Sequence, residues 1–211
     1  EGTCNVFDAV VKAKDEGRRR PWLFLASTSH VYESNVGLLS ETSALGPMNA
    51  YGRTKLQAEE WANHYARRHG LDLCIGRIFS YSAPEQPKSY FIPAIIGKLS
   101  TAPRGATLEI PGIHGTRDFL TPDLICRSLE TFLAEKTTGV YNIGTGSAIK
   151  LLDIVTAIQT RLAREDLIIV PRDEGTIHLR ADVSKLRGLG VELHFDLSAL
   201  IKRMIPLAGE N

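Results

Sequence analysis

The chain has 211 residues, of which 43% are hydrophobic and 23% are charged, and its formal net charge is +1. This size and composition fit one compact domain, or one domain with a smaller lobe, around a sizeable hydrophobic core. A near-zero net charge excludes the strong basic field typical of nucleic-acid binding. No apolar run reaches the length of a membrane span and no signal peptide is visible, so we expect a cytoplasmic protein without a membrane partner.

The three cysteines, Cys4, Cys74 and Cys126, are widely separated in the sequence. They do not have the spacing of metal ligands, and we expect no metal site. Cys74 lies in an apolar segment and Cys126 in an amphipathic one. We therefore expect these thiols to be buried and reduced, as is usual in the cytosol.

Buried strands and amphipathic helices alternate along the chain. Hydrophobic period and flanking residues predict helices over 1–14, 47–69, 90–99, 121–136, 151–164, 184–189 and 197–206. They predict strands over 22–27, 71–79, 107–110, 140–143 and 167–170, with polar loops over 33–46 and 80–88. The second helix is expected to open at Pro47 and to stop at Gly70. This order of strands and helices predicts a parallel α/β sheet.

Three polar residues indicate a proton-transfer site. Tyr51 and Lys55 are four residues apart in a predicted helix, so they share a face. An ammonium group beside a phenol favours the phenolate, so we expect Lys55 to lower the pKa of Tyr51 toward working pH. Thr28 directly follows a predicted strand, and its hydroxyl can hydrogen-bond the same substrate oxygen. Such a trio removes or returns the proton of an alcohol while hydride leaves or joins its carbon.

Six segments form an ordered set of motifs: Ser27–Tyr32, Tyr51–Lys55, Arg77–Ser80, Gly115–Phe119, Tyr141–Gly144 and Ala181–Lys185. In this order they resemble landmarks of the extended branch of the short-chain dehydrogenase/reductase superfamily. This branch comprises the NAD-dependent nucleotide-sugar epimerases, dehydratases and reductases. The resemblance covers nearly the whole chain.

The resemblance implies a Rossmann-like doubly wound parallel sheet with a smaller C-terminal substrate lobe. The cofactor-binding part would comprise residues 1–79 and 116–146, and the substrate lobe residues 80–115 and 147–211. NAD or NADP is the implied cofactor, and a nucleotide sugar is the implied substrate. The active site would lie in the crevice at the carboxyl ends of the strands.

The resemblance also implies a homodimer. In this family the helix that carries the tyrosine and lysine packs, together with the helix before it, across a two-fold axis. These helices correspond to residues 1–14 and 47–69, and Trp61 is a plausible contact between the two copies.

One element that the fold requires is absent from the sequence. A dinucleotide-binding sheet holds the pyrophosphate with a Gly-rich turn between a strand and a helix. Gly144-Thr145-Gly146 follows a strand, but no third glycine opens a helix there. In the resembled family the turn lies near the N-terminus, before anything that matches Glu1. We therefore expect that the N-terminal part of the sheet is missing, and that the chain as it stands binds cofactor poorly.

The cofactor site follows from the resemblance. Tyr51 would be the general acid/base, and Lys55 would also hold the nicotinamide ribose. Ile78 and Phe79 would line the nicotinamide pocket, although both residues also suit a plain hydrophobic core.

The substrate site would contain three residues. Arg117 would pair with the substrate diphosphate, since guanidinium binds phosphate in a bidentate manner; the alternative is an ion pair with Asp118. Arg172 resembles a second phosphate-facing arginine of the UDP-galactose epimerase pattern. Ser80 stands where the family usually has Asn, which weakens or alters the expected contact to the sugar diphosphate.

Two further positions depart from the 4,6-dehydratase pattern. Those enzymes carry an Asp-Glu pair directly after the strand-end Thr, whereas this chain has Ser29 and His30. With no carboxylate there, elimination of water is not expected. In the GDP-fucose synthase pattern the position of His30 holds a cysteine that moves protons beside a ketone, and a histidine can do the same. The alternative is a structural histidine that packs under the loop.

The leading prediction is NAD(P)-dependent oxidoreduction at a sugar carbon, C4, of a nucleotide sugar, by an epimerase or a 4-ketoreductase. The segment with Gln86 after a Pro-containing turn looks more like reductases and dehydratases that act on GDP- or dTDP-deoxysugars. The alternatives are a 4,6-dehydratase and a non-catalytic NAD(P)-binding scaffold or sensor. A decayed site usually loses the tyrosine or the lysine, and both are present here.

Overall fold

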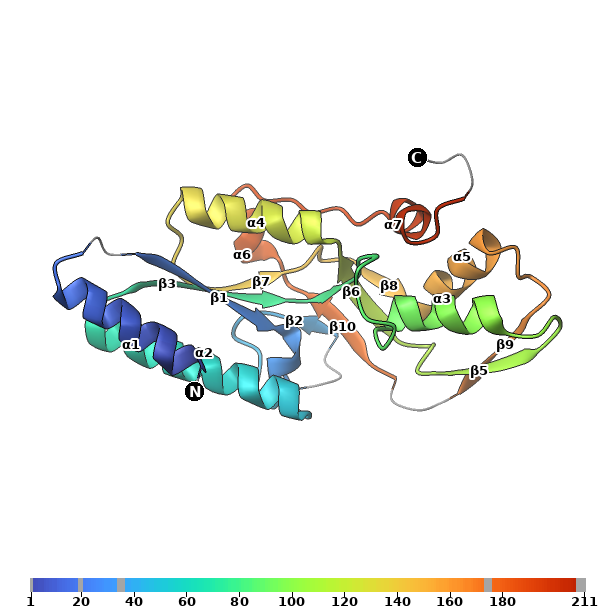
Figure 1. Ribbon diagram of the computed structural model, residues 1–211, viewed down its shortest axis with the longest axis horizontal. Coiled ribbons are helices and arrows are strands. Elements are labelled where there is room, and N and C mark those ends of the chain that lie inside the picture. Colours follow the sequence, from blue (N-terminus) through green and yellow to red (C-terminus); the bar gives the residue numbers. More distant parts are fainter. Residues whose placement is uncertain (1, 19–20, 34–36, 173–175, 208–211) are drawn as a thin grey trace.

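The computed structural model describes residues 2–18, 21–33, 37–172 and 176–207 (Figure 1). Glu1, where the first helix was predicted to begin, and residues 173–175, next to Arg172, lie outside the described residues. The helices are α1 (Gly2–Asp15), α2 (Ala50–His69), α3 (Phe91–Thr101), α4 (Pro122–Ala134), α5 (Leu151–Arg161), α6 (Ser184–Arg187), α7 (Leu197–Met204) and the short 3-10 helix η1 (Ser29–Val31). The strands are β1 (Trp22–Thr28), β2 (Leu38–Leu39), β3 (Asp72–Ile78), β4 (Ser80–Tyr81), β5 (Thr107–Pro111), β6 (Thr116–Leu120), β7 (Gly139–Ile143), β8 (Ala148–Lys150), β9 (Ile168–Arg172) and β10 (His178–Ala181).

Strands β1, β3 and β7 form a sheet in that order. The strands are parallel, as predicted. Alternate side chains of β1 point to opposite faces. Leu23 and Leu25 pack with Phe7 of α1 and Ala62 of α2, whereas Trp22 and Phe24 pack in the cluster that contains Phe132 of α4. Helices thus cover both faces of this sheet, α1 and α2 on one side and α4 and α6 on the other (Figure 1). The doubly wound Rossmann-like arrangement is confirmed.

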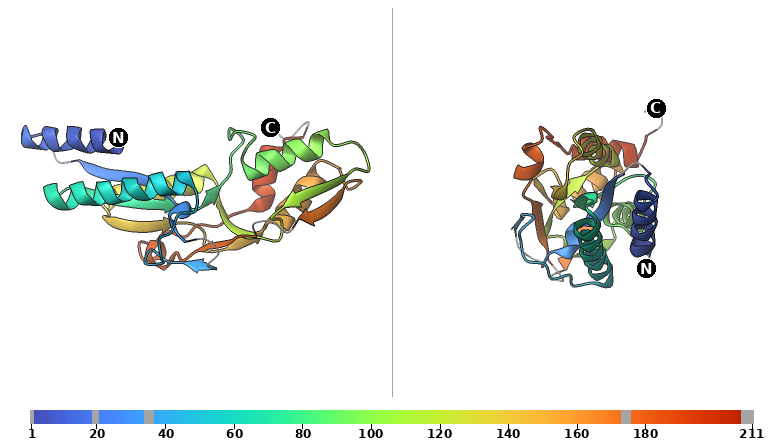
Figure 2. Two further views of the ribbon diagram at one scale, coloured as in Figure 1. Left: turned by 90° about the horizontal axis from the view of Figure 1, so that it is seen from below. Right: turned by 90° about the vertical axis from the view of Figure 1, so that its left-hand side faces the viewer.

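A second sheet contains β2, β10, β6 and β4 in that order, and β8 pairs antiparallel with β6. Strands β5 and β9 form a separate parallel pair. Helices α3, α5 and α7 pack with this pair around a hydrophobic cluster of their own (Figure 2), built on residues such as Leu99, Ile110, Ile154 and Leu200. This cluster is the core of a second lobe. The exact division of the chain into cofactor and substrate parts stays a prediction.

The carboxyl ends of the central strands lie side by side. Thr28, the last residue of β1, is in register with Ile78 of β3, which is in register with Ile143 of β7. Ser80 of β4 follows β3 directly and pairs with Phe119 of β6. The chain therefore passes from the first sheet to the second at the strand ends, where α/β folds bind their ligands.

Two details differ from the sequence predictions. Helix α2 begins at Ala50 rather than Pro47, because Asn49 caps it: its side-chain Oδ1 accepts a hydrogen bond from the Gly52 amide at 2.7 Å. Cys74 is fully buried as expected, but Cys126 is exposed on α4 and Cys4 is half-buried. Cys126 lies on the solvent side of an amphipathic helix, which hydrophobicity alone did not reveal.

Among the described residues, no helix combines the length and the apolar character that crossing a membrane requires. Nor do the described His, Cys, Asp and Glu side chains gather into a cluster that fits a metal ion.

Candidate active site

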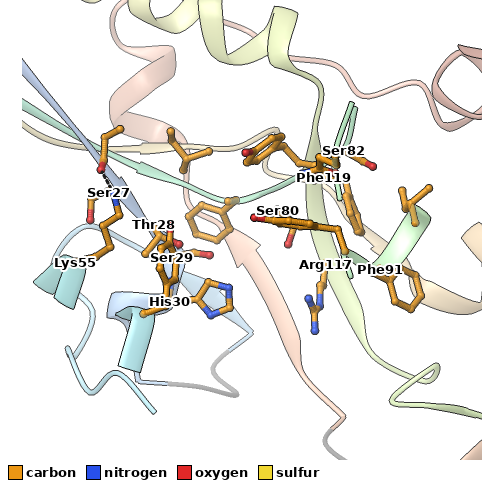
Figure 3. Close-up of a pocket in the computed structure, with 18 residues that line it drawn as sticks. Ser27, Thr28, Ser29, His30, Lys55, Ser80, Ser82, Phe91, Arg117 and Phe119 are labelled. Carbon is orange, nitrogen blue, oxygen red and sulfur yellow. Dashed lines mark hydrogen bonds between the residues drawn. The ribbon is translucent and has the colours of Figure 1, made fainter. Parts of the chain in front are cut away.

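A pocket of about 400 Å³ opens where the carboxyl ends of β1 and β3 meet the second sheet. Figure 3 shows Thr28, His30 and Lys55 on one side and Ser80, Arg117 and Phe119 on the other. Of the residues predicted for the site, all except Arg172 line this pocket; they are Thr28, His30, Tyr51, Lys55, Ile78, Phe79, Ser80 and Arg117. Arg172 is exposed at the end of β9, in register with Pro111.

The side chain of Thr28, the last residue of β1, is fixed by a hydrogen bond from the backbone of the helical turn that follows. It is the N-cap of η1, and its Oγ1 accepts a hydrogen bond from the His30 amide at 3.3 Å. A hydroxyl that accepts in this way keeps its own proton available to donate. Thr28 and Tyr51 both line the pocket, and the Thr28 hydroxyl is near enough to the phenol to lower its pKa. The strand-end hydroxyl and the helix phenol predicted from the sequence therefore meet.

Gly52 explains how Tyr51 comes so close to β1. A Cβ at Gly52 would lie 2.3 Å from the His30 carbonyl oxygen and 2.9 Å from the Pro47 Cβ. Only glycine lets the first turn of α2 approach the backbone of η1 this closely. The approach places Tyr51 beside Thr28, and its side chain remains 52% exposed to the pocket and solvent.

Lys55 anchors α2 to β1. Its Nζ donates a hydrogen bond to the Ala26 carbonyl oxygen at 3.0 Å and lies 5.8 Å from the centroid of the Tyr51 ring. In this geometry burial raises the pKa of Tyr51 above its ordinary value; the hydrogen bond with Thr28 opposes the rise, and nearby Tyr90 and Tyr81 add to it. The prediction that the pKa of Tyr51 is lowered is therefore wrong for this structure, because burial is the largest influence on the phenol and Lys55 is not among the groups that shift its pKa.

His30 lies between Tyr51 and Arg117. Its ring meets the Tyr51 ring edge-on, with 5.9 Å between the centroids, and its Nδ1 lies 3.4 Å from the Asn49 Nδ2. The side chain reaches solvent, yet the walls of the pocket remove enough water to lower the pKa of His30 below its usual value. The positive charge of Arg117 lowers this pKa further, so the imidazole is neutral at pH 7.

Arg117 is half-buried in the pocket wall, and burial lowers its pKa. Its Nε is buried, and no described residue accepts a hydrogen bond from that atom. The alternative of an ion pair with Asp118 is not formed. Asp118 faces away from the pocket, where its carboxylate accepts hydrogen bonds from the amides of Thr145, Gly146 and Ala181. A half-buried cationic group whose buried Nε donor is unused fits an anionic ligand.

The same hydrogen bonds settle the role of the short glycine segment after β7. The amides of Thr145 and Gly146 point at the buried carboxylate of Asp118 at 2.8 Å each. These donors are therefore occupied by the protein itself. Residues 144–146 lead from β7 to β8 and are held against Asp118 of β6, so the amides of Thr145 and Gly146 are not available to bind a pyrophosphate.

Several pocket residues were not predicted. Aromatic rings and small polar groups complete the wall, namely Tyr81, Ser82, Gln86, Tyr90, Phe91 and Phe119. The Oγ of Ser82 is buried and has no hydrogen-bond partner among the described residues. Gln86, by contrast, is committed to its own loop, since it accepts from the Ala83 amide and donates to the Tyr81 carbonyl. Three aromatic residues within 81–91 were the available signal for this wall.

A buried polar network supports the site from behind. The Nη2 of Arg77 in β3 lies 2.7 Å from Oε2 of Glu59 in α2, and Ser27 of β1 donates to the same carboxylate. The guanidinium carbon of Arg77 also lies 4.8 Å from the centroid of the Tyr32 ring, whose hydroxyl donates to the Asn142 Oδ1 at 2.6 Å. This network connects α2, β1, β3 and β7 beneath the pocket.

Comparisons with known proteins identify the family of the chain. A family model described as GDP-mannose 4,6 dehydratase matches residues 1–203. An uncharacterized UDP-glucose epimerase of Bacillus subtilis is 28% identical over 183 residues, which cover 84% of this chain and 56% of that protein. The chain thus spans little more than half the length of this relative.

Two solved structures have the same fold. MoeE5 in complex with UDP-glucuronic acid and NAD is 29% identical with a TM-score of 0.79, covering 96% of this chain and 68% of that one. RMD from Pseudomonas aeruginosa, complexed with NADPH, is 20% identical with a TM-score of 0.83, covering 97% and 70%. The family model spans nearly the whole chain and the fold agrees with it. The chain belongs to the nucleotide-sugar epimerase/dehydratase family of the extended short-chain dehydrogenase/reductases.

Proposed function

We propose that the protein carries out NAD(P)-dependent oxidoreduction at C4 of a nucleotide sugar, as an epimerase or a 4-ketoreductase. The observation that carries this proposal is that Tyr51, Thr28 and Lys55 line one pocket, with the Thr28 hydroxyl near enough to the phenol to act on its pKa. A phenol and a hydroxyl that converge on one point can share one substrate oxygen. The relative MoeE5, whose structure contains UDP-glucuronic acid and NAD, supports the substrate and cofactor classes.

The proton step needs only residues of this chain. Tyr51 would accept the proton of the sugar hydroxyl as the carbon is oxidised, and would return it to the oxygen when a ketone is reduced. Thr28 would donate its hydroxyl proton to the same oxygen, because its lone pair is already engaged by the His30 amide. His30, which also lines the pocket, would provide a second polar contact to the reacting part of the sugar.

The residues at the strand ends fit the nicotinamide half of a cofactor. Ile78 and Phe79 form an apolar wall beside Tyr51 and Lys55, which suits a flat ring next to a ribose. When bound there, the nicotinamide would supply or accept hydride, and Lys55 would hold its ribose. The chain contains no Gly-rich turn for the pyrophosphate. The test of this proposal therefore uses the full-length protein.

The substrate diphosphate would lie near Arg117. The guanidinium is half-buried and its Nε lacks a partner among the described residues, so an anion would satisfy it. Ser80 lies on the same wall of the pocket (Figure 3). Arg172 would join them only if the second lobe moves toward the pocket, and we keep it as a proposed phosphate contact.

The 4,6-dehydratase is the second candidate, because the matching family model carries that name. Elimination of water needs a carboxylic acid beside the sugar. None of the described residues that line the pocket is Asp or Glu, and Ser29 and His30 occupy the positions where dehydratases carry this pair. A pocket without a carboxylate favours oxidation and reduction of the sugar without elimination of water.

Product analysis separates these activities. The full-length protein would be incubated with UDP-, GDP- and dTDP-hexoses and with their 4-keto forms. A reductase consumes NAD(P)H stoichiometrically with a 4-keto sugar, whereas an epimerase interconverts hexoses with no net consumption of cofactor. Release of a 4-keto-6-deoxy sugar would show dehydration and overturn the proposal. The absence of any turnover over the whole panel would favour a non-catalytic role.

We also propose that α1 and α2 form a homodimer interface. The two helices pack against each other on one face of the first sheet (Figure 1). Val6 on α1 is 58% exposed and Trp61 on α2 is 46% exposed, and exposed apolar side chains of this size are typical of interfaces. Trp61→Glu should convert a dimer into a monomer in light scattering. A dimer of unchanged mass would place the interface elsewhere.

A further inference from the structure

Asn49 makes two side-chain contacts that fix the orientation of its amide. Its Oδ1 accepts a hydrogen bond from the Gly52 amide at 2.7 Å, which caps α2. Because a backbone N–H can only donate, the atom that faces it must be the oxygen and not the nitrogen. The helix cap therefore decides which way the amide points.

The other end of the amide faces the imidazole. Asn49 Nδ2 lies 3.4 Å from Nδ1 of His30. An amide nitrogen can only donate, so Nδ1 must be the acceptor and carries no proton. In a neutral imidazole the proton then resides on Nε2. No described residue forms a hydrogen bond with Nε2, while the ring itself lines the pocket beside Arg117 and Tyr51.

From these contacts we infer that Asn49 is a positioning residue: through the cap of α2 it holds His30 as the neutral Nε2–H tautomer, which presents a hydrogen-bond donor to an oxygen of the bound sugar. His30 then acts as a donor of fixed direction and does not shuttle the proton, which passes through Tyr51. The part of this inference that concerns the sugar rests on the proposed function. The tautomer itself does not.

The surroundings of His30 favour the same state. Arg117 faces it from β6, and the uncharged ring of Tyr51 faces it from α2. No carboxylate lines the pocket among the described residues. Protonation would place a second N–H opposite the Asn49 amide and a second cation near Arg117. Both effects oppose the charged imidazolium.

Two substitutions at Asn49 separate the cap from the tautomer. Asn49→Ser keeps a good helix cap but removes the amide that faces His30. Asn49→Asp also keeps the cap, but turns an oxygen toward Nδ1, which should draw the proton to Nδ1. Equal thermal midpoints of the three proteins would show that α2 is capped in each. Any change in the imidazole then reports on the contact and not on the fold.

The test is nitrogen NMR of the full-length protein labelled with ¹⁵N-histidine, with the His30 signals assigned by their loss in His30→Asn. The expected result is a protonated Nε2 in the unmodified protein, a protonated Nδ1 in Asn49→Asp and a mixture in Asn49→Ser. A protonated Nδ1 in the unmodified protein, or one spectrum shared by all three, would overturn the inference.

Steady-state kinetics test whether the Nε2–H of His30 acts as a hydrogen-bond donor to the sugar. With UDP-glucose, GDP-mannose or dTDP-glucose and NAD, loss of a directed donor should lower kcat about 10²-fold in Asn49→Asp, with a smaller loss in Asn49→Ser and little change in KM for NAD. An unchanged kcat together with a changed tautomer would overturn the donor role while the proposed function stands. If the unmodified protein acts neither on these sugars with NAD(P) nor on their 4-keto forms with NAD(P)H, the proposed function fails, and the imidazole spectra still decide the tautomer.

Discussion

Arg77 and Glu59 form a buried ion pair beneath the pocket, with 2.7 Å between Nη2 and Oε2 and both side chains no more than 4% exposed. The Nε of Arg77 also donates to both carboxylate oxygens, at 3.1 and 3.2 Å. Glu59 is on the helix that carries Tyr51, and Arg77 is on the strand that leads to Ser80. The pair therefore fixes the two sides of the site relative to each other.

Glu59→Gln should destabilise the protein by about 3 kcal/mol, because it leaves the buried Arg77 guanidinium without its counter-charge. Urea unfolding followed by circular dichroism measures the change. The neighbouring Glu60 is exposed on the same helix, so Glu60→Gln should change the free energy of unfolding by less than about 0.5 kcal/mol. Equal effects of the two substitutions would show that the ion pair does not contribute as described.

Gly52→Ala should destabilise the protein by about 1–3 kcal/mol, because the new Cβ would overlap the His30 carbonyl. It should also lower activity, since Tyr51 must move away from Thr28. Gly97→Ala in α3 is the matched control: a Cβ there meets nothing within 4 Å, and alanine favours a helix by about 1 kcal/mol. The two variants should shift the thermal midpoint in opposite directions. A stabilising Gly52→Ala would contradict the close approach.

Removal of the Arg117 charge should raise the pKa of His30. The guanidinium is one of the two causes that hold this pKa below its usual value, so Arg117→Gln removes a lowering influence and leaves burial alone. Proton NMR titration of the His30 ring measures the shift. The same variant should bind nucleotide diphosphates more weakly. A His30 pKa that falls or stays constant would show that Arg117 does not face the imidazole.

The cysteines should differ in reactivity. Burial raises the pKa of Cys74 to about 12, so its thiol stays protonated at pH 8 and has no access to reagents. Cys126 is exposed on α4. Alkylation of the native protein followed by peptide mapping should modify Cys126 first and Cys74 only after unfolding. Rapid modification of Cys74 in the native state would contradict the packing of β3 against α4.

Much of this fold follows from the sequence, because long periodic segments carry their own signal. Strands β1 and β3 are apolar on both faces, and α2 and α4 show clear helical stripes. Strands β2, β4 and β8 have only two or three residues each, which is too short for a period. Their pairing depends on partners that are distant in sequence, so no local pattern marks them.

The sequence predicted several of the residues that line the pocket, but it did not predict the direction in which the pKa of Tyr51 is shifted. The order of Thr28, Tyr51 and Lys55 placed them at one strand end and on one helix face. The Ala26 carbonyl competes for the Lys55 ammonium, and only the fold shows this. The sequence analysis did not predict a buried partner for Arg77, although a charge inside an apolar strand is rarely left unpaired and was the available signal. Only the three-dimensional structure identifies Glu59, which lies on another element of the fold, as the partner of Arg77.

The pH profile should reflect the raised pKa of Tyr51. Since burial raises this pKa above its ordinary value, the phenol is protonated at pH 7 in the free protein. Reduction of a ketone uses the protonated form, so its kcat/KM should be flat near neutral pH and fall as pH rises through this pKa. Oxidation of an alcohol uses the phenolate and should accelerate with rising pH. Steady-state rates from pH 6 to 10 in both directions would reveal the opposite slopes, and parallel slopes would contradict the assignment.

The most direct test of the account is the turnover of Tyr51→Phe in the full-length protein with the nucleotide sugar that the unmodified protein converts. The substitution removes a single oxygen from a half-exposed side chain, so the thermal midpoint should not change. General acid/base catalysis predicts a loss of about 10²- to 10⁴-fold in kcat. Tyr65→Phe, on the same helix but outside the pocket, should retain full activity. A Tyr51→Phe protein that retains turnover within a few-fold of the unmodified protein would contradict the central claim.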